Sequence, residues 1–187
     1  MIKFLIILIL IFSYQSINAK NDDWPSYGKD SGGGHYSEAD EITPENVKNL
    51  KKVWTHRSGD FHAGLNWTED VTPNSSQQTS FQATPILVND TLFYCTPYTR
   101  VFALDPETGK EKWVFDPEVE IEQKALLHCR GVGSWIDLNK SENEECYHRI
   151  LTGTIDAELF AIDGKTGKLC SDFGDNGKVN LRDGLGE

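Results

Sequence analysis

Several side chains of this sequence have the type and spacing of catalytic or metal-binding groups. Asp105 and Asp163 occur 58 residues apart in similar surroundings, and two carboxylates can act as a general acid and a general base. Each aspartate, however, begins an Asp-x-x-Thr-Gly sequence, in which the aspartate side chain bonds the backbone of a turn. We therefore expect structural roles for both. Four histidines do not show the spacing of metal ligands, as in His-Glu-x-x-His, and we assign them no role: His35, His56, His62 and His148.

The four cysteines predict disulfides rather than a zinc site, because none of them forms a Cys-x-x-Cys pair. In an oxidising compartment four cysteines allow three pairings, which the sequence alone does not separate. We favour Cys129 with Cys146, because the polar stretch between them closes into a loop at little entropic cost. The pairings that involve Cys95 and Cys170 stay open.

The overall charge is strongly acidic. The 187 residues include 18 lysines and arginines against 29 aspartates and glutamates, for a formal net charge of −11. A nucleic-acid binding protein needs a basic face that neutralises phosphates. The composition therefore argues against a nucleic-acid partner.

The first 19 residues predict a secretory signal peptide. Lys3 precedes an apolar run at residues 4–12, and the segment closes on small and polar residues up to Ala19. The run is too short to cross about 30 Å of hydrocarbon with any margin. We expect cleavage after Ala19 and export of residues 20–187. An uncleaved membrane anchor is the alternative.

Two segments share one pattern, an apolar strand followed by an Asp-x-x-Thr-Gly turn and a second strand. The first copy covers residues 101–113 and the second covers residues 159–170. In each turn the glycine supplies a positive φ angle. Further strands are expected at residues 91–95 and 148–152, so each copy contains three or four strands. Helical periodicity is limited to one turn near residues 44–50, with Thr43 as its N-cap.

Repeated units of this size predict a β-propeller, because each unit has a face that only a neighbouring unit can bury. A propeller needs at least four blades to close. We therefore expect an all-β chain in which residues 20–187 form the N-terminal segment and about two blades of a longer propeller. A complete small all-β domain with an incidental duplication is the alternative.

The first repeat contains Ala-x-Asp-x-x-Thr-Gly-Lys-x-x-Trp at residues 103–113, which resembles the tryptophan-docking motif of the pyrroloquinoline quinone (PQQ) dehydrogenases. The eight blades of that family each carry a version of this motif. The second copy matches through Lys168 but has Ser171 at the tryptophan position. Five other stretches are similar to the glucose, quinate and shikimate branch of the family: residues 24–28, 42–47, 81–85, 129–132 and 168–174.

Two differences from particular branches of the family indicate where this chain belongs within it. The membrane-bound glucose dehydrogenases begin with several transmembrane helices, whereas here one short apolar segment precedes the propeller. The methanol and ethanol dehydrogenases carry two adjacent cysteines near the cofactor, whereas here Cys129 is single. A PQQ alcohol dehydrogenase is therefore the second hypothesis. The third is a non-catalytic propeller of the outer-membrane-assembly type, in which neither the 81–85 nor the 129–132 sequence is expected.

The resemblance implies four cofactor-binding residues. Arg130 matches the arginine that contacts PQQ, and a guanidinium suits the carboxylates of that cofactor. Gln82 matches a glutamate or glutamine beside the polar edge of PQQ. Thr154, with Thr152 close by, lies near a hydroxyl contact of the family, and His128 would orient cofactor or substrate or transfer a proton. The alternative for each is structural: a surface ion pair, a solvated strand end, a turn or a packed histidine.

The function that the resemblance implies is PQQ-dependent oxidation of a sugar or polyol hydroxyl, as in glucose dehydrogenase, with electrons passed to a quinone or another periplasmic acceptor. A bound Ca²⁺ would act as Lewis acid. Its ligands and the catalytic aspartate are expected beyond residue 187, so this chain contains no catalytic or metal-binding residue. We expect the 187-residue chain by itself to be inactive. We expect the whole protein to be in the periplasm, and association with the membrane is the alternative.

Overall fold

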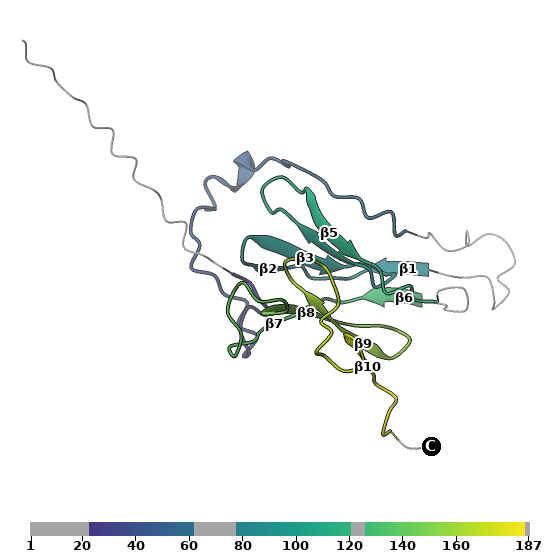
Figure 1. Cartoon of the computed structure of the whole chain (residues 1–187). Helices are drawn as coiled ribbons and strands as arrows, with labels where there is room; N and C mark the ends of the chain where they lie inside the picture. The colour runs from purple at the N-terminus through teal and green to yellow at the C-terminus, as the bar shows by residue number, and fades with distance from the viewer. Residues whose placement is uncertain (1–22, 62–77, 121–125, 186–187) are drawn as a thin grey trace, which may run out of the picture.

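The computed structural model describes residues 23–61, 78–120 and 126–185, so the expected signal peptide, residues 1–19, lies outside the described residues. The chain forms two four-stranded sheets and one two-stranded pair (Figure 1). Within the described ranges there is no α-helix, and no helix has the length and apolar character needed to cross a membrane.

The helical turn expected near residues 44–50 is a short 3-10 element, η1 (Val47–Asn49). Its N-cap is Asn46 and not Thr43, so that part of the expectation is wrong. The carbonyl of Thr43 accepts a hydrogen bond from the Val47 amide (2.9 Å), and the Asn46 side chain accepts one from the Thr43 amide (2.8 Å). The asparagine therefore closes the turn that precedes the helix.

The first sheet is an antiparallel meander of four strands, β2 (Ile86–Val88), β3 (Thr91–Cys95), β4 (Val101–Leu104) and β5 (Glu111–Phe115), in spatial order β2-β3-β4-β5. All four residues of β4 are buried, whereas β5 at the sheet edge alternates between exposed and half-buried side chains. This alternation is typical of an edge strand with one solvated face.

The second sheet repeats this arrangement with β7 (Gly133–Ile136), β8 (His148–Gly153), β9 (Glu158–Asp163) and β10 (Lys178–Asn180), in the order β7-β8-β9-β10. Figure 1 shows the two sheets one above the other. The repeat expected from the sequence is therefore a structural repeat, and each copy is one four-stranded blade of a propeller.

The Asp-x-x-Thr-Gly turns have the structural role expected of them. In the first turn Asp105 Oδ1 accepts hydrogen bonds from the amide and the hydroxyl of Thr108, and in the second Asp163 Oδ1 accepts the same pair from Thr166. The glycines at the ends of these turns have φ angles of 70° and 75°. Neither aspartate is free for acid–base chemistry, so the catalytic interpretation of this pair is excluded.

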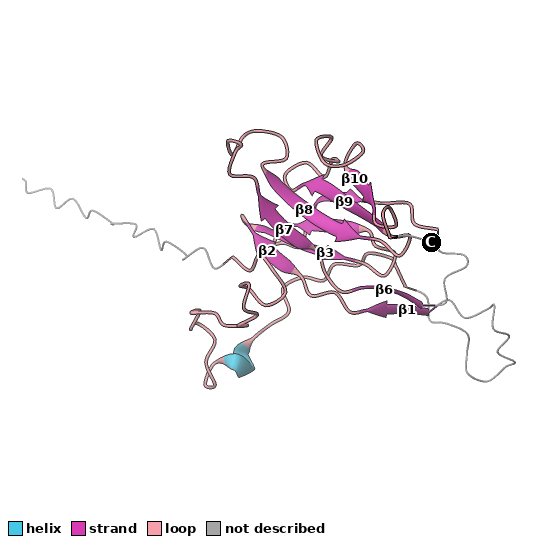
Figure 2. Cartoon of the chain, turned by 90° about the horizontal axis from the view of Figure 1, so that it is seen from below, coloured by secondary structure: helices cyan, strands magenta, loops and turns pink. Residues whose placement is uncertain are grey.

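The blades pack face to face around one apolar core. Residues of β3 and β4, among them Phe93 and Val101, meet Ile150, Phe160 and Ile162 of β8 and β9. Figure 2 shows strands of the two sheets lying along each other. Burial of these side chains is the main contribution that holds the blades together.

A tryptophan joins each blade to the segment that precedes it in the chain. Trp113 of β5 donates a hydrogen bond from Nε1 to the Gly164 carbonyl of the second blade (3.1 Å), and its ring lies against Gly167. Trp54 repeats this contact on the first blade, because its Nε1 donates to the Pro106 carbonyl (3.0 Å) and its ring lies against Gly109. The motif in the sequence identifies Trp113 but not Trp54, since no docking turn precedes Trp54.

The expected disulfide between Cys129 and Cys146 is wrong. The bonds are Cys95–Cys129 and Cys146–Cys170. Cys129 lies before the first residue of β7, whereas Cys146 comes just before His148, which pairs with the last residue of that strand. The length of β7, roughly 13 Å for four residues, therefore separates the two cysteines. The low entropic cost of closing a short loop does not decide the pairing when a strand keeps its ends apart.

Candidate functional site

A parallel strand pair brings together three of the four residues expected to bind the cofactor. This pair consists of β1 (Gln78–Phe81) and β6 (Leu126–Cys129), and the register places Ser80 beside His128 and Phe81 beside Cys129. Figures 1 and 2 both show the two strands side by side, outside the four-stranded sheets.

The two faces of this pair have different surroundings. Successive side chains of a strand point to opposite faces, so Ser80 and His128 share one face. Gln82 and Arg130 each follow by two residues and continue that face, and Gln82 Nε2 donates a hydrogen bond to Ser80 Oγ (2.9 Å). Gln82, His128 and Arg130 are all exposed to solvent.

The opposite face of the pair is attached to the first blade. The Phe81 ring lies 6.0 Å from the ring of Tyr94, and Cys129 is bonded to Cys95 at the end of β3. The pair therefore presents a polar face to solvent while its other face is held against a buried strand.

The backbone of Arg130 is fixed, whereas its side chain is exposed. The Arg130 carbonyl accepts a hydrogen bond from the Thr84 amide (3.0 Å), so the segments after β1 and β6 run together. A Cβ atom on Gly131 would lie 3.4 Å from the Thr84 carbonyl oxygen, an ordinary van der Waals contact. The Arg130 guanidinium forms no ion pair with any described residue. The surface ion pair considered as its structural alternative is therefore absent from the described ranges.

The fourth expected residue, Thr154, lies at the same end of the second blade but is engaged in a turn. The first residue of β7, Gly133, pairs with Leu151 of the antiparallel strand β8. Gly153, two residues further along β8, therefore lies at the end of the sheet that the chain reaches just after Arg130. The Thr154 hydroxyl accepts a hydrogen bond from the Glu158 amide (3.3 Å) and closes the β8–β9 hairpin. Thr152 differs, because its hydroxyl oxygen is buried and has no partner among the described residues.

A polar network that the sequence did not indicate lies behind Phe81. The hydroxyl of Tyr94 bonds His56 Nδ1 (2.5 Å), and His56 Nε2 bonds Glu111 (2.8 Å). Burial and the negative charges of Asp60 and Glu111 raise the pKa of Tyr94 to about 12. The phenol therefore stays protonated at neutral pH. His56 is 38 residues from Tyr94, and no local motif marks the pair.

A buried ion pair accompanies this network. Asp60 is 5% exposed and accepts hydrogen bonds from Arg100, which also donates to the Ser58 carbonyl (2.7 Å). Together with His56, these contacts attach the segment before residue 61 to the first blade. The polar groups of this network bond one another across the segment and the blade. We therefore assign the network a structural role, which is to support the fold beside the site.

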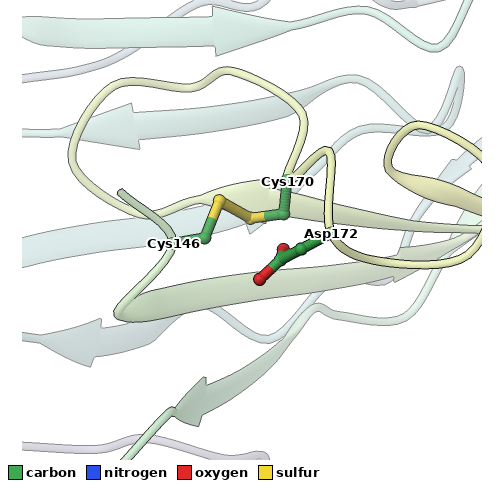
Figure 3. A group of neighbouring side chains, drawn as sticks. All are labelled: Cys146, Cys170 and Asp172. Atoms are coloured by element: carbon green, nitrogen blue, oxygen red, sulfur yellow. A yellow bond between two sulfur atoms is a disulfide. The ribbon is translucent and has the colours of Figure 1, made fainter. Parts of the chain in front are cut away.

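The side chains with metal-ligand chemistry that cluster among the described residues are Cys146, Cys170 and Asp172 (Figure 3). The two sulfur atoms are bonded to each other, so no thiolate is present to bind a metal. Hydrogen bonds from Lys140 and Arg149 lower the pKa of Asp172 and occupy its carboxylate. This cluster is a disulfide beside an ion pair.

A cavity of about 820 Å³ lies at the opposite end of the blades. It is bounded by the end of β2, the start of β8 and the turn after β9, and it includes Val88, His148 and Thr166. His148 Nε2 and Ser134 Oγ are 2.9 Å apart within it, and burial lowers the pKa of His148. Gln82 and Arg130 precede β2 and β7, so the cavity is separate from the polar face that they form.

Comparisons with known proteins agree with this architecture. The family profile described as "Glucose/ethanol/alcohol dehydrogenase, beta-propeller domain" (PQQ) matches residues 24–187. The quinoprotein glucose dehydrogenase A of Acinetobacter calcoaceticus is 39% identical over 175 residues, which cover 86% of this chain and 20% of that protein. The quinate/shikimate dehydrogenase (quinone) of Acinetobacter baylyi is 37% identical over 185 residues, which cover 90% of this chain and 21% of that protein.

Among solved structures, the quinohemoprotein alcohol dehydrogenase from Comamonas testosteroni aligns with a TM-score of 0.60 at 23% identity. The alignment covers 90% of this chain and 21% of that one, and at this identity it shows a shared fold. The chain spans about a fifth of the length of the curated relatives that it matches. On its sequence and on its blades, the chain belongs to the PQQ dehydrogenase β-propeller family.

Proposed function

We propose that this chain is the N-terminal part of an exported, eight-bladed PQQ-dependent dehydrogenase. The whole protein would oxidise a hydroxyl group of a sugar or polyol and pass the electrons to a quinone or another periplasmic acceptor. The names of the relatives, glucose dehydrogenase and quinate/shikimate dehydrogenase (quinone), support this substrate class and this acceptor.

The polar face of β1 and β6 fits the cofactor. PQQ is a planar ring system with three carboxylates, so its site needs a cation and polar donors at the ring edge. Arg130 supplies a guanidinium that is paired with no described acid, and a guanidinium binds a carboxylate through two parallel hydrogen bonds. The placement of Gln82 and Arg130 on one face of the β1–β6 pair, with Arg130 in no ion pair with a described acid, carries the proposal.

The other residues have supporting roles. Gln82 both donates and accepts hydrogen bonds, so it suits an edge that carries carbonyl and carboxylate oxygens. His128 adds an exposed imidazole to the same face, and we assign it to orienting cofactor or substrate. Thr154 is half-buried at the same end of the second blade and stays the hydroxyl candidate, whereas the Thr152 oxygen is buried out of reach of a ligand.

The chemistry that PQQ would supply here when bound is that of a hydride acceptor that stores two electrons. This chain would hold one edge of the ring system and orient it. A Ca²⁺ ion would polarise the quinone, and we place its ligands and the catalytic aspartate beyond residue 187, as the family resemblance implies.

Export to the periplasm is part of the proposal. The described residues contain two disulfides and no free cysteine, and disulfides form and persist in oxidising compartments. Residues 1–19 would direct the chain there. A signal peptide that is retained would leave the protein on the membrane.

The test is a titration of the full-length apo protein with PQQ in the presence of Ca²⁺, followed by dye-linked oxidation of glucose and of ethanol. Arg130→Ala should weaken PQQ binding by about 10- to 100-fold, the usual range for a lost charge-assisted hydrogen bond. Arg182→Ala, an exposed arginine far along the chain, is the control and should bind as the wild type does.

Each other outcome favours a different hypothesis. A wild-type protein that binds no PQQ would favour the non-catalytic propeller. Binding of PQQ together with a preference for ethanol would favour the alcohol dehydrogenase branch. The bond of Cys129 to Cys95, in place of a bond between adjacent cysteines, argues against that branch.

A further inference from the structure

The disulfide Cys95–Cys129 ends one residue before Arg130, and its two halves come from different parts of the propeller. Cys95 is the last residue of β3 in the first blade, whereas Cys129 is the last residue of β6, which leads into the second. We propose that this disulfide is a positioning element that holds Arg130 in place for a carboxylate of the cofactor. This inference rests on the proposed function.

The anchor at one end of the disulfide is rigid. Cys95 is 0% exposed and belongs to the core cluster that contains Phe93 and Val101. Close-packed interiors resist displacement, so the position of the Cys95 sulfur is set by the packing of the first blade. Through the S–S bond this position is transmitted to Cys129 and to the residue that follows it.

The other restraints on Arg130 are few. The strand before it, β6, is paired with β1 alone, over four residues, and this pair lies outside both four-stranded sheets. An isolated two-stranded pair is marginally stable in water. After the pair, one backbone hydrogen bond from Thr84 holds the Arg130 carbonyl. Val132, two residues further on, is 8% exposed and packs in the same core cluster as Cys95, so it also ties this segment to the blades. The disulfide is the covalent tie, and it acts on the residue directly before Arg130.

The second disulfide provides a matched control. Cys146–Cys170 encloses 24 residues of sequence, against 34 for Cys95–Cys129, so the two bonds restrict the unfolded chain to a similar extent. It lies within the second blade, in a core cluster with Ala161, and bonds no residue next to Arg130. Its loss should reduce stability without moving the guanidinium.

The experiment compares Cys95→Ala/Cys129→Ala with Cys146→Ala/Cys170→Ala in the full-length protein, by PQQ titration in the presence of Ca²⁺ and by thermal unfolding. We expect both double variants to unfold at lower temperature. The Cys95/Cys129 variant should also bind PQQ at least 10-fold more weakly than wild type, whereas the control should stay within about 2-fold. Equal losses of affinity in the two variants would overturn the proposal.

A double-mutant cycle tests whether the disulfide acts through Arg130. In an Arg130→Ala background, removal of the Cys95–Cys129 bond should cause no further loss of PQQ affinity, because the group that it positions is gone. A full additional loss in that background would show that the disulfide acts by another route. Either result is independent of turnover by the loaded enzyme.

Two further measurements keep the test decisive. If the alanine pair does not fold, selective reduction of the wild type, with alkylation and mass spectrometry to identify the opened bond, replaces it. Amide hydrogen exchange of the apo protein should rise at residues 128–132 after the Cys95–Cys129 bond is opened and stay unchanged in β8.

The failure of this inference is distinguishable from that of the proposed function. A wild type that binds no PQQ overturns both. A wild type that binds PQQ, with a Cys95/Cys129 variant that binds it equally well, overturns the positioning role alone.

Discussion

At the residue scale, single side chains in this fold have two opposite kinds of environment. Arg130 is exposed and has no described acidic partner, so its charge is available to a ligand. His148 is half-buried between the blades, against Phe93 and Gly164, with Ser134 as its hydrogen-bond partner. The first arrangement suits binding, and the second links the stability of the blades to protonation.

The half-buried imidazole of His148 predicts a dependence of stability on pH. Burial lowers the pKa of His148, although the charges of Asp163 and Asp23 act in the opposite direction. Because the unfolded chain has the ordinary value of about 6.5, the stabilisation is complete above that pH and is lost as the pH falls through the lower value of the folded state. His148→Gln should therefore reduce the decline of the unfolding free energy between about pH 7 and pH 5.

Urea denaturation at several pH values measures this effect, with the exposed His35→Gln as the control. The control should keep the wild-type dependence on pH. An unchanged dependence in His148→Gln would show that other groups cause the decline.

At the element scale, the turn of one blade and the tryptophan that precedes that blade form one unit. Gly167 has a φ angle of 75°, and a Cβ atom placed on it would lie 2.8 Å from the ring of Trp113. Gly109 and Trp54 have the same relation on the first blade. Glycine at these positions allows both the left-handed backbone and the close approach of the ring.

Gly167→Ala should lower the unfolding free energy through both effects. The left-handed backbone costs about 1 kcal/mol for a residue with a Cβ atom, and displacement of the indole adds about 1–2 kcal/mol. In a Trp113→Ala background only the backbone cost should remain, so the two substitutions should couple. Denaturant unfolding of the four proteins of the cycle measures this coupling.

Gly153→Ala is the matched control, because a Cβ atom placed on Gly153 would meet no other atom within 4 Å and its φ angle is not positive. It should change stability by less than about 1 kcal/mol. If Gly167→Ala is no worse than this control, the docking of Trp113 does not depend on the glycine.

At the scale of the whole molecule, the two described blades are fewer than a closed propeller needs, since closure takes at least four blades. The chain also spans about a fifth of the length of the curated relatives that it matches. Both observations support the proposal that the chain is part of a longer propeller.

The longer propeller leads to a prediction about activity. Residues 20–187 alone, supplied with PQQ and Ca²⁺, should oxidise neither glucose nor ethanol, because the proposed metal ligands and catalytic aspartate are in later blades. The full-length protein under the same conditions is the control. Turnover by the short chain in a dye-linked assay would show that the catalytic residues are within it.

The local structure of the repeats follows from the amino-acid sequence alone. The hydrogen bonds from Thr108 to Asp105 and from Thr166 to Asp163, and the positive φ angles of the glycines that end these turns, involve residues within five positions of each other. Such turns depend on the chemistry of a few neighbouring side chains. The blades, the family and the residue types of the polar face were therefore readable from the sequence.

Which distant segments meet depends on the packing of the folded blades. Gln82 and Arg130 share a face because β1 pairs with β6 in parallel, and no residue within either strand encodes that register. Cys129 bonds Cys95 because the packing of the first blade places β3 against this pair, and Trp54 docks without any motif of its own. Contacts of this kind depend on the surfaces that the folded blades bring together, and separation along the chain carries little information about them.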